Sequence, residues 1–197
     1  HSFEINSYWF NMPLHDLPEE LHSLKITSNR FDQPITHLPR KLNDLLLCAS
    51  SFNHPLDRLS VNLKSLTINC CKYDQPLDKL PNRLQSLELN SVRTFNQPLD
   101  TLPNKLQSLS LIHCDSLTQP LSGLPASLNS LTINYCEKLN QLLCDLPVSL
   151  KLLDIHVKGP YTLYYIPKTL KIKINGKEIV DESSCWFKKD YCIKLGK

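Results

Sequence analysis

The sequence predicts a repeat solenoid: a right-handed superhelix with a parallel β-sheet on one face, extended or 3₁₀ segments on the other, and little α-helix. Three observations predict this fold class. An aromatic residue or leucine recurs at offsets of 21 or 22 residues, a Leu-Pro pair follows it, and a Leu-x-x-Leu-x-(Leu/Ile) motif comes last. A fixed period near 22 residues indicates units that stack on their neighbours.

Each unit begins with the recurring large residue, followed in most units by Asn or Asp, then Pro and an aliphatic residue. The seven starts are Phe10, Phe31, Phe52, Tyr73, Phe95, Leu117 and Leu139. The Pro here and the Pro of the Leu-Pro pair fix φ and remove amide donors, so this side of the unit is not a regular helix. We expect the side-chain oxygen of the Asn or Asp to cap the amides of its own turn.

The last part of each unit predicts a strand. In the first unit Leu24 and Ile26 alternate with polar residues, and every later unit repeats this two-residue period, which is typical of a strand with one buried face. Repeated strands at a fixed phase stack in parallel. The sequence therefore predicts one continuous sheet with a leucine-rich buried side and a mixed polar exposed side.

The chain divides into three segments. Residues 1–9 are expected to form an N-terminal cap, because their large apolar side chains can cover the open end of the first unit. Residues 10–158 hold the seven repeats. Residues 159–197 are expected to hold an atypical last rung, a β-hairpin turning at Asn175-Gly176, and a C-terminal cap.

The repeat unit resembles a known family. Leu-x-x-Leu-x-(Leu/Ile) is the leucine-rich repeat pattern, and Phe-Asn-x-Pro-Leu followed by Leu-Pro-x-x-Leu-x-x-Leu-x-Leu is similar to the FNIP repeat from residue 10 to about 157. That family occurs largely in amoebae and in the giant viruses that infect them. The resemblance implies a non-catalytic scaffold that binds another protein. Relatives often carry an F-box and recruit substrates to a ubiquitin ligase; only nine residues precede Phe10, so that role is a hypothesis about a longer parent or a separate partner.

The partner is expected to bind the exposed side of the sheet. The candidate residues occupy two alternating positions of each strand: Lys25, Leu46, Thr67, Asn69, Glu88, Asn90, Ser110, Ile112, Thr132, Asn134, Asp154 and His156. Interfaces are usually anchored by aromatic residues or Arg, and these positions hold neither. The Phe/Pro side and the cap therefore remain alternative binding surfaces. A structural protein that associates with its own copies, for example in a virion, is the alternative function.

The cysteines have a structural explanation. Counted from the first Leu of the strand motif, Cys71, Cys114 and Cys136 share one position, where leucine-rich repeats carry a small residue that turns the chain out of the strand. We expect Cys185 and Cys192 to be reduced, with a pair formed under oxidation as the alternative. A cytoplasmic location, or the host cytoplasm for a viral protein, fits free thiols.

Composition and motifs exclude other classes of function. No run of eighteen apolar residues and no signal peptide is visible, and the charges of the repeats are nearly balanced, so neither a membrane nor nucleic acid is expected as partner. The seven histidines show no metal-ligand spacing, and four glycines are too few for a phosphate-binding loop. We therefore expect no catalytic residues, metal, cofactor or small-molecule substrate.

Overall fold

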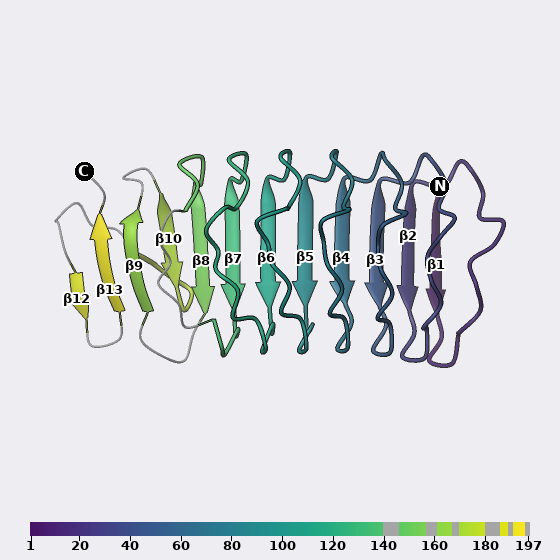
Figure 1. Ribbon diagram of the computed structural model, residues 1–197, viewed down its shortest axis with the longest axis horizontal. Coiled ribbons are helices and arrows are strands. Elements are labelled where there is room, and N and C mark those ends of the chain that lie inside the picture. Colours follow the sequence, from purple (N-terminus) through teal and green to yellow (C-terminus); the bar gives the residue numbers. More distant parts are fainter. Residues whose placement is uncertain (140–145, 157–160, 167–169, 180–185, 189–190, 196–197) are drawn as a thin grey trace.

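The computed structural model describes residues 1–139, 146–156, 161–166, 170–179, 186–188 and 191–195. Over these residues the chain is a parallel β-solenoid of about seven turns, with repeats of about 21 residues and no helix (Figure 1). The strands are β1 (Ser2–Asn6), β2 (Ser23–Thr27), β3 (Asp44–Cys48), β4 (Ser65–Asn69), β5 (Ser86–Asn90), β6 (Ser108–Ile112), β7 (Ser130–Asn134), β8 (Leu152–His156), β9 (Tyr161–Ile166), β10 (Lys171–Ile174), β11 (Lys177–Ile179), β12 (Trp186–Lys188) and β13 (Tyr191–Leu195).

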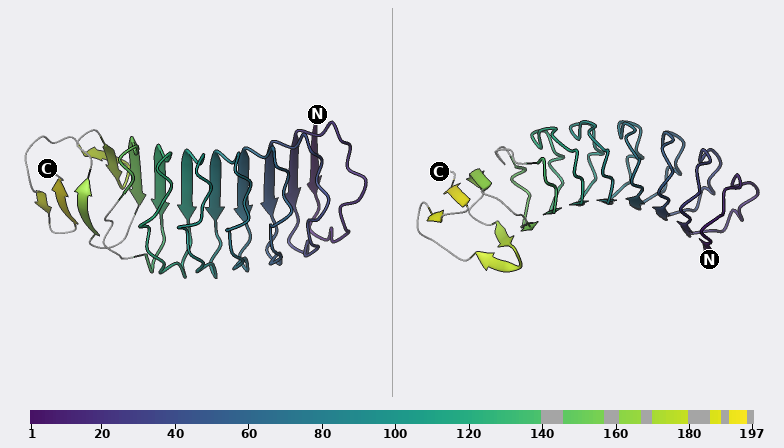
Figure 2. Two further views of the ribbon diagram at one scale, coloured as in Figure 1. Left: turned by 45° about the horizontal axis from the view of Figure 1, so that its top comes forward. Right: turned by 90° about the horizontal axis from the view of Figure 1, so that it is seen from below.

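The strands form two sheets. The larger has ten strands in the order β1-β2-β3-β4-β5-β6-β7-β8-β10-β11, and the smaller has the order β12-β13-β9. In the larger sheet every neighbouring pair from β1 to β10 is parallel, while β10 and β11 are antiparallel. Strands β2 to β8 lie along the inner, concave side of a shallow arc and the loops along its outer, convex side (Figure 2).

The alternation within each strand sorts side chains between the core and the concave face, as the sequence predicts. Leu24 is 1% exposed and Ile26 is fully buried, whereas their neighbours on β2 are exposed or half-buried. Strands β4 to β8 repeat the same pattern of burial. Burial of two aliphatic side chains per rung stabilises the sheet by roughly 1.5–3 kcal/mol for each side chain.

The unit starts form a second layer of the core on the convex side. The rings of Phe10, Phe31, Phe52, Tyr73 and Phe95 stack from rung to rung, with centroids 5.9–6.3 Å apart and planes within 12°. The Tyr73 hydroxyl is buried and has no hydrogen-bond partner among the described residues, and burial raises the pKa of Tyr73. Beyond Phe95 the column continues with Leu117 and Leu139, which are fully buried.

The Asn and Asp after the unit start do not cap their own turns, so that expectation is wrong. Asn11 Oδ1 accepts the main-chain N–H of Asp32 at 2.9 Å, and Asn53 Oδ1 accepts that of Asp74 at 2.9 Å. Each carboxamide therefore reaches the next coil. The reason is that stacked rungs lie only ~4.8 Å apart, while the local turn is already closed by the main chain, as in the bond from Phe52 N–H to the Ala49 oxygen.

Units of 21 and 22 residues differ at one point, directly after the strand. In the first three units the residue directly after the strand is already buried in the core. These residues are Ser28 after β2, Ala49 after β3 and Cys70 after β4. In the next three units one extra residue lies between the end of the strand and the buried residue. These residues are Ser91, His113 and Tyr135, and their φ values are 53°, 52° and 56°, in the left-handed region.

One expectation about the cysteines is wrong, because the third unit lacks the extra residue. Cys114 and Cys136 fill the buried slot as expected, but in the shorter third unit the slot holds Cys70, and Cys71 lies half-buried outside it. Counting from the first Leu of the motif fails here because the third unit lacks the inserted residue. The Cys70 thiol donates to the Leu47 oxygen of the preceding rung, 3.6 Å away.

The ends of the larger sheet differ. At the N-terminal end β1 adds a rung in register with β2, where Ile5 packs against the core while Tyr8 and Trp9 are 54% and 70% exposed. At the other end the predicted hairpin is present between β10 and β11. Asn175 and Gly176 both have positive φ, 51° and 77°, as the type I′ turn of a two-residue hairpin requires.

Candidate functional site

The concave face carries side chains in straight columns, because adjacent parallel strands pair without any shift in register. The column through the middle of the strands, here called the central column, spans nine rungs. It consists of Glu4, Lys25, Leu46, Thr67, Glu88, Ser110, Thr132, Asp154 and Lys173. Seven of these residues are the ones that the sequence predicts there, and Glu4 and Lys173 extend the column at its two ends.

A second column, here called the outer column, lies two residues further along each strand. Asn90, Ile112, Asn134 and His156 are direct partners across β5 to β8, and Asn69 occupies the same position of β4. All are half-buried. Ile112 therefore places an aliphatic side chain between two amides, and the structure brings the predicted residues of this column together on one surface.

The charges of the concave face are concentrated at its ends. Lys25 Nζ lies 3.0 Å from Glu4 Oε1, but both side chains are about half exposed, so this ion pair contributes little to stability. From β4 to β7 the strands carry a single charged residue, Glu88, whose Oε1 accepts a hydrogen bond from Asn90 Nδ2 at 3.1 Å. The middle of the face is thus a surface of hydroxyls and amides around one carboxylate.

Two rings that the sequence analysis missed lie at the edge of this face. His113 and Tyr135 are the inserted left-handed residues after β6 and β7, and their rings stack with centroids 5.0 Å apart and planes at 13°. The His156 ring follows, 6.1 Å from that of Tyr135. Tyr135 is 43% exposed. The 22-residue length of these units is the signal that could have revealed the row, because an extra residue after a strand must leave the core-facing pattern.

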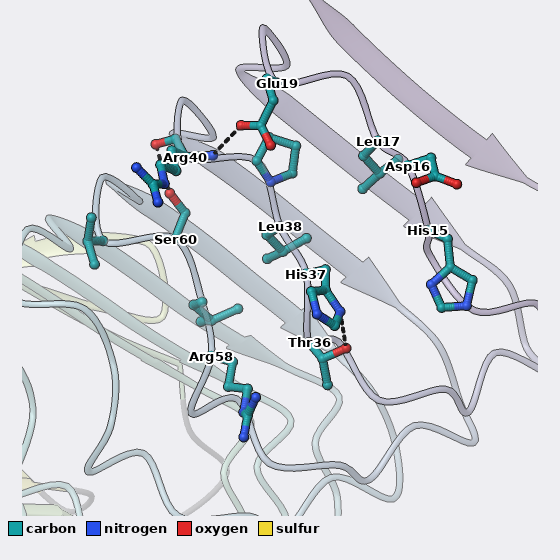
Figure 3. A pocket seen from close by; sticks show the side chains of 13 residues that line it. His15, Asp16, Leu17, Glu19, Thr36, His37, Leu38, Arg40, Arg58 and Ser60 are labelled. Carbon is teal, nitrogen blue, oxygen red and sulfur yellow. Dashed lines mark hydrogen bonds between the residues drawn. The ribbon is translucent and has the colours of Figure 1, made fainter.

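A separate pocket of about 820 Å³ lies among the convex-side turns of the first three units (Figure 3). Its polar groups bond locally: the Arg40 main-chain N–H donates to Glu19 Oε2 at 3.5 Å, and Thr36 Oγ1 lies 2.8 Å from His37 Nδ1. A hydroxyl nucleophile and its base need an acid to orient the ring, and the described residues give His37 no such hydrogen bond. The pocket contains none of the predicted sheet-face residues.

The described cysteines are free thiols. Cys70 is buried, and burial raises its pKa to about 12, so it stays protonated at neutral pH. Cys114 and Cys136 also donate to carbonyl oxygens of an earlier rung, those of Leu89 and Leu111. The predictions about Cys185 and Cys192 fall outside the side chains that the structure describes.

In the part of the chain that the structure describes, no three His, Cys, Asp or Glu side chains converge as a set of metal ligands. The same part contains no helix with the length and apolar composition needed to cross a membrane.

Stacked coils with a parallel sheet on the concave side and leucines in the core define a repeat-solenoid scaffold of the leucine-rich-repeat type. Within that class, the family model described as FNIP Repeat matches residues 73–114, which comprise most of the fourth and fifth units. Residues 73–114 are therefore similar to the FNIP repeat family. No catalytic family is evident, and none of the curated proteins matches the chain.

Proposed function

We propose that the chain is a non-catalytic module that binds another protein through its concave face. The observation that supports this proposal is the central column, nine side chains in unbroken register across nine rungs. At a spacing of ~4.8 Å per rung the column is roughly 38 Å long, enough to contact a folded partner along its length. Leu46 and Ile112 supply apolar contacts, Glu88 and the terminal charges give orientation, and Tyr135 adds an aromatic anchor at the edge.

The FNIP resemblance suggests narrower forms of this proposal. The bound protein would be a substrate presented to a ubiquitin ligase, with the ligase contact made by a longer parent chain or by a separate subunit. A cytoplasmic location, that of the host for a viral protein, accords with the five free thiols among the described cysteines.

The test compares two baits of equal charge change in amoebal lysate. The first carries Lys25→Glu, Glu88→Lys and Asp154→Lys on the concave face. The matched control carries Arg58→Glu, Asp57→Lys and Asp78→Lys on exposed convex positions. A protein retained by the parent and by the convex variant but lost from the concave variant, identified by mass spectrometry and then bound in purified form, supports the proposal. Equal retention by both variants contradicts it.

Self-association is a second candidate, favoured by one observation. Phe3, Tyr8, Trp9 and Met12 are 46–70% exposed and all belong to the first residues of the chain, at the β1 end of the solenoid, where the rings of Tyr8 and Trp9 are in contact. An exposed group of this kind is typical of an interface. Light scattering after gel filtration measures the molar mass of the same parent sample, and a concentration-dependent rise above 22.6 kDa that Trp9→Ser abolishes would move this candidate ahead.

A further inference from the structure

One cluster on the concave face has chemistry that protein binding does not require. Strand β8 places Asp154 and His156 two residues apart, so both side chains point to the same face. Strand β7 brings Asn134 directly opposite His156. His156 Nδ1 lies 2.9 Å from Asn134 Oδ1 and 3.5 Å from Asp154 Oδ1. Both oxygens therefore lie near one ring nitrogen at the C-terminal ends of two adjacent strands.

Among the described residues, one oxygen of the Asp154 carboxylate lacks a hydrogen-bond donor. This atom, Oδ1, is buried, and no described residue donates a hydrogen bond to it; His156 Nδ1, 3.5 Å away, is close enough for an ion pair but does not form a hydrogen bond. A buried carboxylate oxygen without a donor is destabilising. Lys173 is the register partner of Asp154 on β10, yet the two form no ion pair in the described part of the chain. A cation between the converging atoms would remove this cost.

We propose that Asn134, Asp154 and His156 form a binding site for one divalent transition-metal ion. Ligand atoms at about 2.1 Å from an ion, at octahedral or tetrahedral angles, are about 3.0–3.4 Å from one another. The two distances measured from His156 Nδ1 lie on either side of this range. The 2.9 Å contact is a hydrogen bond from the Nδ1 proton of His156 to Asn134 Oδ1, and an ion that displaces this proton would contact both atoms. The 3.5 Å separation leaves Asp154 Oδ1 within reach of the same ion after a small movement of its side chain.

The donor set selects the class of ion. An imidazole nitrogen with a carboxylate and an amide oxygen suits Zn²⁺, Ni²⁺ or Cu²⁺ better than Mg²⁺ or Ca²⁺, which take oxygen ligands. The side chains of His156 and Asp154 are 29% and 26% exposed, so water can complete the coordination. Asn134 Oδ1 also accepts the main-chain N–H of His156 at 3.1 Å, which orients the amide while its second lone pair faces the ring. This site does not depend on the proposed protein partner.

The spacing of histidines along the sequence does not reveal this site. Here the ligands are a single histidine, a carboxylate two residues earlier, and an amide 22 residues earlier on the neighbouring rung. The third ligand is an amide oxygen, so no three His, Cys, Asp or Glu side chains need to meet.

The test titrates Zn²⁺, by calorimetry, into reduced protein freed of metal with a chelator. The parent is expected to bind one equivalent that Asp154→Asn and His156→Gln each weaken by at least about 10-fold, as expected for loss of a ligand or its support. His113→Gln is the matched control: it removes another ring of the same row, with no expected change in affinity. Lys173→Gln is expected to tighten binding, because it removes a positive charge facing Asp154.

Co²⁺ absorption then separates this site from the cysteines, since a thiolate ligand adds an intense near-ultraviolet charge-transfer band. Spectra of Co²⁺ bound through nitrogen and oxygen, without that band, agree with the proposal. Thermal unfolding of each variant checks that the fold is retained, and the Lys173→Gln result holds even where a ligand variant fails to fold. Parent-like Zn²⁺ affinity in both ligand variants, or a thiolate band for the bound ion, would overturn it.

Discussion

Leu131→Ala tests the assignment of faces at the middle of the sheet. Leu131 is fully buried on β7, with Leu109 and Leu153 as its register partners on the two adjacent strands. Both neighbouring strands are hydrogen-bonded in the ladder, so the core can collapse only slightly into the cavity. We therefore expect the upper part of the range for buried leucines, a loss of about 3–5 kcal/mol in the free energy of unfolding.

Thr132→Ala is the matched control one residue away. Thr132 is half-buried on the concave face and makes no side-chain hydrogen bond in the described part of the chain. Its replacement is expected to change stability by about 1 kcal/mol or less. Urea denaturation followed by circular dichroism measures both variants. For a chain of this length the leucine variant should also lower Tm by about 6–20 °C. Equal losses from the two substitutions, at equal m-values, would refute the assignment.

Two further predictions concern the coil-to-coil amide bonds and the buried thiol. Asn53→Ala removes the acceptor for the Asp74 main-chain N–H and should destabilise the protein by about 1 kcal/mol in urea denaturation. Asn104→Ala, at an exposed turn, should be neutral; equal effects would contradict the role of the ladder. Iodoacetamide at pH 8 should alkylate Cys71 well before Cys70 in the native protein, because the raised pKa and burial of Cys70 keep its reactive thiolate scarce; mass mapping that finds the reverse order would contradict this.

The period of the sequence predicts the core and both faces of the sheet because one physical constraint acts on every rung. A leucine such as Leu24 must recur at the same phase, or its unit cannot stack on the next. The concave-face positions follow from the same alternation, since the neighbours of Leu24 and Ile26 must point the other way. The hairpin at Asn175 was predictable for a local reason, the need for two positive φ values.

Other features depend on contacts that a period does not encode. The choice between Cys70 and Cys71 depends on where a 22-residue unit places its extra residue, and the repeat fixes only the total length. The side-chain oxygen of Asn11 has equally suitable donors in its own turn and in the next coil, and only the stacking geometry decides between them. The approach of His156 to Asp154 depends on side-chain rotamers, which no pattern along the chain determines.

The residue inserted after β5, β6 and β7 lies outside the core, so one position in each of these coils does not take part in core packing. The left-handed residue leaves the strand register and the following buried slot unchanged, as comparison of Ala49 with Val92 shows. Substitutions at Ser91, His113 and Tyr135 can therefore alter the surface without repacking the core. These three positions offer a compact library for engineering new recognition specificity, and natural divergence between copies of the repeat has the same freedom there.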